Sequence, residues 1–456
     1  MRMHQDGTPG RHPDLLAEIA SFKEALRGYP KEQFPVYYGM LQYRLGLSYL
    51  DLPVGDRQEN LRKALDAFHE ALAVFGRERF PGEYARVQNS IGVAYRQLPG
   101  DRMANLRRAI ACYREALEVL DKENRPQEYG ATQNNLGLAY AELPDGDRAD
   151  NQRLAIAAYK EALTVFTRDR FPRQYAATQY NLGLVYAELP EGDFEEELRR
   201  AIHCYEEALQ VYTAVGAMNQ TALVHNSLGI AWMALSGHDN LAKAIAAFSQ
   251  ALRAVPKGQA PLQYAVIKNN LGLAYAQRRA DDPADLRRAV VAFQDALAAV
   301  DPDAHAPEKA QVQQNSHRAL DRLAERGYPG TALDHLVALV AAVDDEEGVA
   351  IMREQVDHWI SVPDRHQRMV AEWVRALLRL EALHRRVAIR RGVHVLLEQP
   401  TDQMEQVLKA HVEALTHLAP HDQVAAREDL EEVARELYGP QRTRVSDMLR
   451  RLWGDR

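Results

Sequence analysis

The chain has 456 residues. That length fits about three globular domains of roughly 150 residues each, or one elongated array, and is too long for a single compact core. Hydrophobic residues make up 46% and charged residues 26% of the sequence, which excludes a mostly disordered chain. There are 56 Lys and Arg against 64 Asp and Glu, a net charge of -8. This balance argues against a nucleic acid as partner, because proteins that bind the phosphate backbone usually carry excess positive charge.

The sequence contains no segment typical of membrane insertion or export. No apolar run approaches the roughly 18 residues that a membrane helix needs. Residues 1–12 are polar and lack the apolar stretch of a signal peptide. We therefore expect a cytoplasmic protein without a membrane partner, and a flexible N-terminus over residues 1–12.

An internal repeat dominates the first two thirds of the sequence. Six times, a Leu-Gly or Ile-Gly pair is followed three residues later by Tyr or Trp. The glycines are spaced 46, 45, 46, 46 and 43 residues apart, a regularity that indicates a stacked array. They are Gly46, Gly92, Gly137, Gly183, Gly229 and Gly272.

Each copy carries two helical patterns. The first helix opens with a proline, as at Pro81, and ends at a second proline in a Pro-Gly-Asp turn, as at Pro99. The second helix is predicted to begin at an N-capping Asn or Asp, namely Asn60, Asn105, Asn151, Asn240 and Asp285. It then shows Ala, an aromatic residue and Ala at helical spacing, as in Ala155, Tyr159 and Ala162. We expect the aromatic rings to fill the gaps between neighbouring helix pairs.

Partial copies flank the array. Phe22, Ala25 and Leu26 match the second-helix pattern one period upstream of the first full copy. After the sixth copy, residues 310–325 align with a first helix, but Ser316 and His317 replace the Leu-Gly pair. Both segments are predicted to be capping helices.

The Leu-Gly-x-x-Tyr motif followed by Ala-x-x-x-Phe/Tyr-x-x-Ala resembles the tetratricopeptide repeat (TPR). The long period and the sequence Thr-Gln-Asn-Asn-Leu-Gly at residues 132–137 resemble kinesin-light-chain repeats and the arrays attached to bacterial CHAT proteases. The resemblance implies an all-α fold, a right-handed α-solenoid of about six helix pairs with capping helices over residues 13–327. It departs from the family in its period, since the usual TPR has 34 residues.

A composition change near residue 327 marks the predicted start of a C-terminal helical domain, residues 328–456. The repeat register disappears, while helical patterns continue over 331–343, 347–360, 364–397, 402–418, 422–437 and 441–453. Arginines interleaved with apolar residues over 364–391 predict an amphipathic helix with a basic face. This face could bind an acidic partner or nucleic acid, although a solvated face over a packed core is the simpler interpretation.

Asparagines recur directly before the Leu-Gly pair and suggest a binding groove. In TPR arrays the first helices line the concave groove, and family members bind peptides or partner proteins there. A side-chain amide offers both a donor and an acceptor to an extended peptide. The alternative is that these residues hydrogen-bond neighbouring helices. The candidate groove residues are Tyr43, Arg86, Asn89, Asn134, Asn135, Tyr180, Asn181, Asn226, Asn269 and Asn270.

Other residues of the first helices can be explained by packing or by hydrogen bonds within the array. Leu47, Val93 and Leu138 could seat apolar partner side chains or pack in the core. The glutamines at the repeated position Gln42, Gln88, Gln133 and Gln179 are expected to form hydrogen bonds between repeats.

No catalytic, metal or cofactor motif is found. The two cysteines, Cys112 and Cys204, lie in repeat helices two periods apart and are expected to be buried thiols. His411, His417 and His421 do not have a common metal-ligand spacing. We predict a non-enzymatic scaffold that binds a peptide or partner protein. The alternatives are a regulatory receptor whose C-terminal domain transmits binding, or an unrecognised enzyme in that domain.

Overall fold

A computed structural model describes residues 12–144, 146–189, 192–235, 237–255, 258, 260–278, 282–300, 305–328, 330–361 and 366–453. These residues form 21 helices and no strand, which confirms the predicted all-α class. They divide into two compact units, up to residue 236 and from residue 237 onward. Within the described ranges, none of the helices combines the length and hydrophobicity needed to cross a bilayer.

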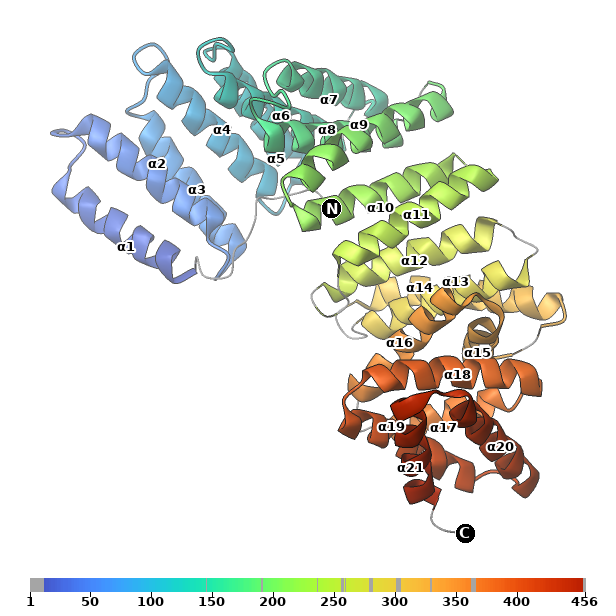
Figure 1. Ribbon diagram of the computed structural model, residues 1–456. Coiled ribbons are helices and arrows are strands. Elements are labelled where there is room, and N and C mark those ends of the chain that lie inside the picture. Colours follow the sequence, from blue (N-terminus) through green and yellow to red (C-terminus); the bar gives the residue numbers. More distant parts are fainter. Residues whose placement is uncertain are drawn as a thin grey trace. The chain divides into compact units, whose positions relative to one another are not determined.

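Unit 1 is a stack of helix pairs in which copies one to four each supply one pair and copy five supplies its first helix (Figure 1). The first helices of copies two to four begin at Pro81, Pro126 and Pro172, as predicted, and that of copy one begins at Pro35. The lone helix α1 packs on α2, which confirms the predicted N-terminal cap. The helices are α1 (His12–Gly28), α2 (Pro35–Asp51), α3 (Arg57–Leu72), α4 (Pro81–Gln97), α5 (Arg102–Leu117), α6 (Pro126–Glu142), α7 (Arg148–Leu163), α8 (Pro172–Glu188), α9 (Phe194–Ala214) and α10 (Met218–Ala234).

The turn inside each pair has a fixed conformation that follows from its sequence. In copy two, Leu98 is extended (φ -67°, ψ 125°) because Pro99 follows it. Gly100 adopts φ 107°, a left-handed conformation that favours glycine. The carboxylate of Asp101 then caps α5 by accepting a hydrogen bond from the Ala104 backbone N–H at 3.0 Å.

The predicted N-caps are therefore wrong for the second helices of the first copies. Asn60 and Asn105 lie four residues inside their helices, and the preceding aspartates, Asp56 and Asp101, are the caps. The asparagine amides instead donate to backbone carbonyls of the preceding turn, for example from Asn60 to Val54 at 2.8 Å. The aspartate is the cap because it follows the left-handed glycine of the turn, and its carboxylate accepts a hydrogen bond from a free N–H group of the first helical turn.

The spacing between the glycine and the aromatic residue recurs in the copies because the two residues pack against each other inside a helix pair. A Cβ on Gly137 of α6 would lie 2.7 Å from the ring of Tyr159 in α7, the second helix of the same copy. The same relation links Gly46 to Phe68, where a Cβ would lie even closer to the ring. The rings thus fill the space within each pair, a contact that the sequence analysis did not predict. Phe68 also shares a core with Ile91 and Ala94 of the next copy, so the expectation that the rings fill gaps between neighbouring pairs stays a prediction.

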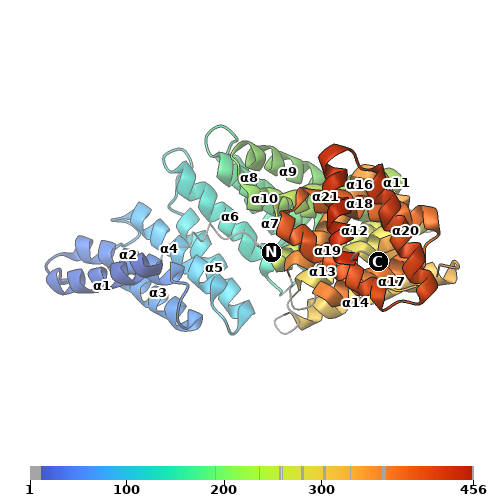
Figure 2. The same cartoon turned by 60° about the horizontal axis from the view of Figure 1, so that its bottom comes forward.

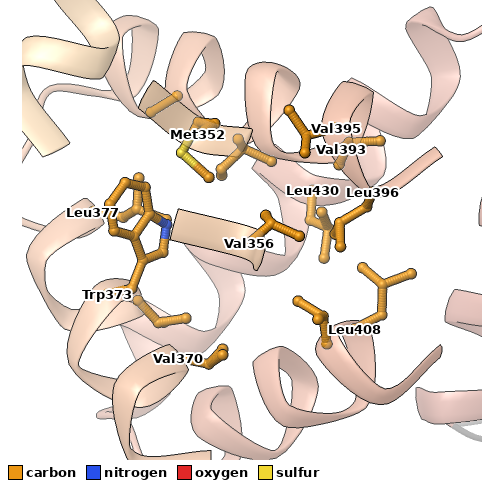
Figure 3. Packing of buried hydrophobic residues seen from close by; sticks show 14 of the residues in the cluster. Met352, Val356, Val370, Trp373, Leu377, Val393, Val395, Leu396, Leu408 and Leu430 are labelled. Atoms are coloured by element: carbon orange, nitrogen blue, oxygen red, sulfur yellow. The ribbon is translucent and has the colours of Figure 1, made fainter. Parts of the chain in front are cut away.

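Unit 2 combines the last repeat helices with the C-terminal helices. Figure 2 shows the C-terminal helices gathered in one bundle. Its core includes Met352, Val356 and Trp373, which lie together in Figure 3. The helices are α11 (His238–Ala254), α12 (Pro261–Arg278), α13 (Pro283–Ala299), α14 (Ala306–Glu325), α15 (Ala332–Ala342), α16 (Asp345–Ser361), α17 (His366–Leu377), α18 (Ala382–Glu398), α19 (Thr401–Thr416), α20 (Pro420–Glu436) and α21 (Gly439–Trp453).

The single long helix predicted over 364–397 is two helices, α17 and α18. No proline or glycine marks the break after Leu377, so the sequence pattern runs through it. The arginines on this stretch do not form a free basic face, because several are paired inside unit 2. The carboxylate of Asp429, almost fully buried, accepts hydrogen bonds from both Arg385 and Arg386.

Packing is continuous across the predicted domain boundary at residue 328. Val291 of α13 belongs to the same core as the C-terminal helices. The domain boundary at residue 328 and the solenoid range 13–327 remain predictions. They describe where the sequence repeat ends. The predicted flexible N-terminus lies outside the described residues except for His12.

Both cysteines are free, and they lie in helices α5 and α9. Cys204 is buried and Cys112 is partly buried. Burial raises the pKa of each thiol to about 12. Both residues therefore pack as weakly reactive apolar side chains, as the sequence predicts.

Candidate functional site

A groove crosses the first helices of unit 1 and has a volume of about 730 Å³. Its walls come mainly from α2, α4, α6 and α8, one first helix from each of four successive copies. The repeat produces this groove, because equivalent positions of stacked helices fall on the same face. Five predicted candidates line it, namely Asn89, Asn134, Asn135, Tyr180 and Asn181.

A ladder of hydrogen bonds runs along this face with one rung per repeat. In each rung, the residue three positions before the glycine of one copy bonds the residue two positions before the glycine of the next. The amide of Asn135 donates to the Oδ1 of Asn89 at 3.0 Å. The amide of Asn181 donates to the Oδ1 of Asn134 at 3.4 Å. Copies that lack asparagine keep the rung with hydroxyl groups, as in Tyr43–Ser90 (3.4 Å) and Tyr180–Ser227 (3.2 Å).

The same rule holds inside unit 2. The amide of Asn315 in α14 donates to the Oδ1 of Asn269 in α12 at 2.9 Å. Asn315 precedes His317, the residue that replaces the glycine in the capping helix. The rung therefore persists where the Leu-Gly pair itself is lost.

The ladder leaves part of each amide's hydrogen-bonding capacity unused. A side-chain amide has two N–H donors and an oxygen that can accept two hydrogen bonds. Asn89 uses one acceptor position in its rung, and Asn134 accepts from Asn181 and from the Thr178 hydroxyl (3.2 Å). Asn89, Asn134 and Asn135 are only partly buried, so their remaining polar atoms can reach a molecule in the groove.

The groove also has apolar and charged walls. Leu47, Val93 and Leu138 line it, so these residues take part in the groove as well as in packing. Arg96 lines it too, but its guanidinium is held by Glu142 at 3.2 Å. Arg57 is a second cation of the wall.

The other five predicted candidates do not line the groove. Arg86 is exposed and pairs with Glu83 at 3.3 Å, and it is not among the groove residues. Asn226 lies in α10, beyond the helices that form the groove. Asn269 and Asn270 lie on α12 in unit 2. Tyr43 does not line the groove but supports it through its rung to Ser90.

The sequence analysis missed Arg57, Gln97 and Thr178, which line the groove. The guanidinium of Arg57 donates to the carbonyl oxygen of Leu50 at 2.7 Å and also bonds Gln97. A recurring Gly-Asp-Arg step, at residues 55–57, 100–102 and 146–148, is the signal that could have found Arg57.

The repeated glutamines form a second set of polar contacts, away from the ladder. In copy two, the amide of Gln88 donates to the hydroxyl of Tyr84 (3.0 Å) and to the carboxylate of Glu115 (2.6 Å). The Tyr84 hydroxyl donates to Glu115 at 2.8 Å. Because all three residues belong to one copy, the expectation that these glutamines bridge repeats is wrong.

The chain was compared with known proteins. No family model and no curated protein matches it. Among solved structures, BtubC (BKLC) from P. vanneervenii is 20% identical, with a TM-score of 0.39 over 60% of this chain and 93% of that one.

Two further similar structures cover more of this chain. A STAND protein with a tetratricopeptide repeat sensor from Pyrococcus horikoshii is 14% identical, with a TM-score of 0.35 over 94% of this chain and 56% of that one. The antigen c5321 of uropathogenic Escherichia coli, which displays an SLR fold, is 14% identical, with a TM-score of 0.30 over 95% and 94%. At these values the assignment of repeated helix pairs rests on the chain's own structure.

Proposed function

We propose that the protein is an interaction scaffold whose unit 1 groove binds an extended peptide segment of a partner protein. The observation that carries the proposal is the ladder of side-chain amides along the groove wall. Amides at Asn89, Asn134, Asn135 and Asn181 can offer donors and acceptors to a peptide backbone, whatever the side chains of that peptide.

The apolar positions of the groove support the same occupant. Leu47, Val93 and Leu138 line the groove together with the amides, one from each of three successive first helices. An extended peptide presents backbone groups and side chains alternately, so it can satisfy amides and bury apolar side chains together. The groove volume of about 730 Å³ suits a short segment of chain.

The ladder also connects neighbouring helices by hydrogen bonds. Peptide binding and helix packing by these asparagines predict different experimental results. A peptide display library would be selected on the wild-type protein and re-tested on a variant with Asn134, Asn135 and Asn181 replaced by Ala. If the asparagines bind the peptide, the selected peptides should lose affinity for this variant. Circular dichroism should show that the variant is still folded. Unchanged affinity would assign the asparagines to helix packing alone.

A second variant blocks the groove without removing a ladder bond. Ala177 of α8 lines the groove and is partly exposed, so Ala177→Trp places an indole in the peptide's path. Ala157→Trp on the exposed face of α7 is the matched control. We expect binding to be lost in the first variant and kept in the second. Equal binding by both would place the peptide site elsewhere.

A further inference from the structure

The sixth copy replaces the repeated Tyr-Gln-Glu contact with a charged one. Copies one to four carry a tyrosine hydroxyl bonded to a glutamate of the second helix, as in Tyr129 and Glu161 at 2.8 Å. In copy six the equivalent positions are Tyr264, Lys268 and Asp295. The Lys268 ammonium bonds the Asp295 carboxylate at 2.7 Å. The same ammonium lies 5.5 Å from the centre of the Tyr264 ring.

A residue from outside the repeat completes this cluster. Glu354 of α16 lies 3.3 Å from the Lys268 ammonium, so one buried cation is shared by two carboxylates. Lys268, Asp295 and Tyr264 are each more than nine-tenths buried. Half of the Glu354 side chain is exposed, which places its carboxylate at the boundary between the cluster and solvent.

The cluster opens into a cavity of about 680 Å³ within unit 2. Its polar side is formed by Tyr264, Asp295, Glu354 and Asp357. Its other side is apolar and comes from α13 and α15, with Val291, Ala298, Ala332, Leu333 and Leu336. A cavity with an apolar wall and a few converging polar groups has the usual composition of a small-molecule site.

The charges decide which kind of ligand fits. Three carboxylates line the cavity, those of Asp295, Glu354 and Asp357. Of these, Asp295 and Glu354 share the one nearby ammonium, that of Lys268. A ligand with a positive group would gain charge-assisted hydrogen bonds from Glu354 and Asp357, while an anion would meet like charge. The apolar wall needs a hydrocarbon part in the same molecule.

We propose that this cavity binds a small organic cation, a primary ammonium on an apolar chain, with the ammonium at Glu354 and Asp357 and the chain against Leu333 and Leu336. This site is separate from the unit 1 groove and does not depend on the function proposed for it. It also gives a reason for the departure of copy six from the repeat, because Lys268 holds Asp295 and Glu354 in place at the cavity wall.

The titration of Glu354 gives the binding a pH dependence. Partial burial against the cavity wall, aided by the neighbouring Asp295 carboxylate and opposed by Lys268, raises the pKa of Glu354 to about 7. The other titratable groups that face it are Tyr264 on α12 and Asp357 on α16, while the lining residues of α15 are apolar. A bound cation favours the ionised carboxylate, so affinity should rise as the pH passes upward through about 7.

The test measures binding of hexylammonium to the full chain by titration calorimetry, with hexanol as the neutral probe of equal length. Wild type should bind hexylammonium saturably and more tightly than hexanol. Replacing Glu354 by Gln should weaken hexylammonium binding by roughly tenfold or more and should flatten its pH dependence, since a hydrogen bond to a charged group is lost. Glu346→Gln, an exposed site on the same helix outside the cavity, is the matched control.

A variant whose cavity is filled by a large side chain separates loss of binding from loss of folding. Ala298 lines the cavity and is exposed, so Ala298→Trp should abolish binding of both probes in a protein that remains folded. Ala382→Trp, at an exposed position of α18, should leave binding unchanged. Absence of saturable binding to wild type, equal affinity for hexanol, or an unchanged affinity of Glu354→Gln would each overturn the proposal.

Discussion

Asn135 donates a hydrogen bond of 3.0 Å to Asn89, a residue 46 positions earlier and on the neighbouring first helix. The separation is one residue more than the 45-residue repeat from Gly92 to Gly137, because the contact joins positions offset by one residue in adjacent copies. The contact recurs as the helices stack. The same contact is made with hydroxyl groups where a copy lacks asparagine, as in Tyr180 and Ser227. The ladder is therefore a property of the position rather than of one residue type.

The two asparagines should be energetically coupled. Asn89→Ala and Asn135→Ala should each reduce the opening free energy of this region by about 1 kcal/mol, and the double variant by less than the sum. The reason is that the second substitution removes a partner that the first has already left unpaired. Hydrogen exchange of the amides in α4 and α6 measures these free energies locally. Additive losses would show that the contact contributes nothing to stability.

Gly137 should tolerate no side chain. A Cβ there would lie 2.7 Å from the ring of Tyr159, which is 1% exposed and has no room to move. Gly137→Ala should destabilise unit 1 by about 1–3 kcal/mol through overpacking, although alanine favours helices. Gly28→Ala is the control, because no atom lies within 4 Å of a Cβ at that position. Thermal unfolding followed by circular dichroism compares the two, and equal melting temperatures would contradict the packing argument.

The aspartate caps should account for measurable helix stability. Asp101→Ala removes the acceptor for the Ala104 backbone N–H and should cost about 1 kcal/mol. Asp101→Asn should cost only a few tenths of a kcal/mol, since asparagine is an equally good cap. Urea unfolding of both variants separates the cap from charge effects. A loss as large for Asn as for Ala would mean that the charge of Asp101, and not its hydrogen bond, stabilises α5.

Much of the fold could be predicted from the sequence because the same helical pattern occurs in six copies. Local features repeat with the sequence. They include the helix starts at Pro81, Pro126 and Pro172 and the buried apolar stripe that contains Tyr159. The break between α17 and α18 was missed because no proline or glycine marks it. There, packing against different helices decides the chain path, and that information is not local.

The candidate groove was only partly predictable for a related reason. Periodicity places Asn134 and Asn135 on one face, but it does not say which neighbour each amide bonds. Arg86 was expected in the groove, yet it pairs with Glu83 on its own helix. The cavity beside Lys268 was not predicted at all, since Glu354 reaches it from a helix 86 residues away in sequence.

Glu354 should make the stability of unit 2 depend on pH. Burial and the nearby Asp295 raise its pKa from 4.5 to about 7, so the folded state holds a proton that the unfolded state has released. Stability should therefore fall as the pH rises from about 4.5 to about 7 and stay level above it. Glu354→Gln cannot ionise, and it should become more stable relative to wild type across this window.

Tryptophan fluorescence can follow this effect in unit 2, because Trp359 and Trp373 are buried there with ring centroids 5.5 Å apart. Urea unfolding of wild type and of Glu354→Gln would be compared at several pH values between about 5 and about 8. Glu346→Gln corrects for the general loss of one negative charge, since Glu346 is exposed on the same helix. A stability difference between Glu354→Gln and wild type that does not change with pH would contradict the raised pKa, because a carboxyl that titrates at its ordinary value in both states contributes no slope in this window.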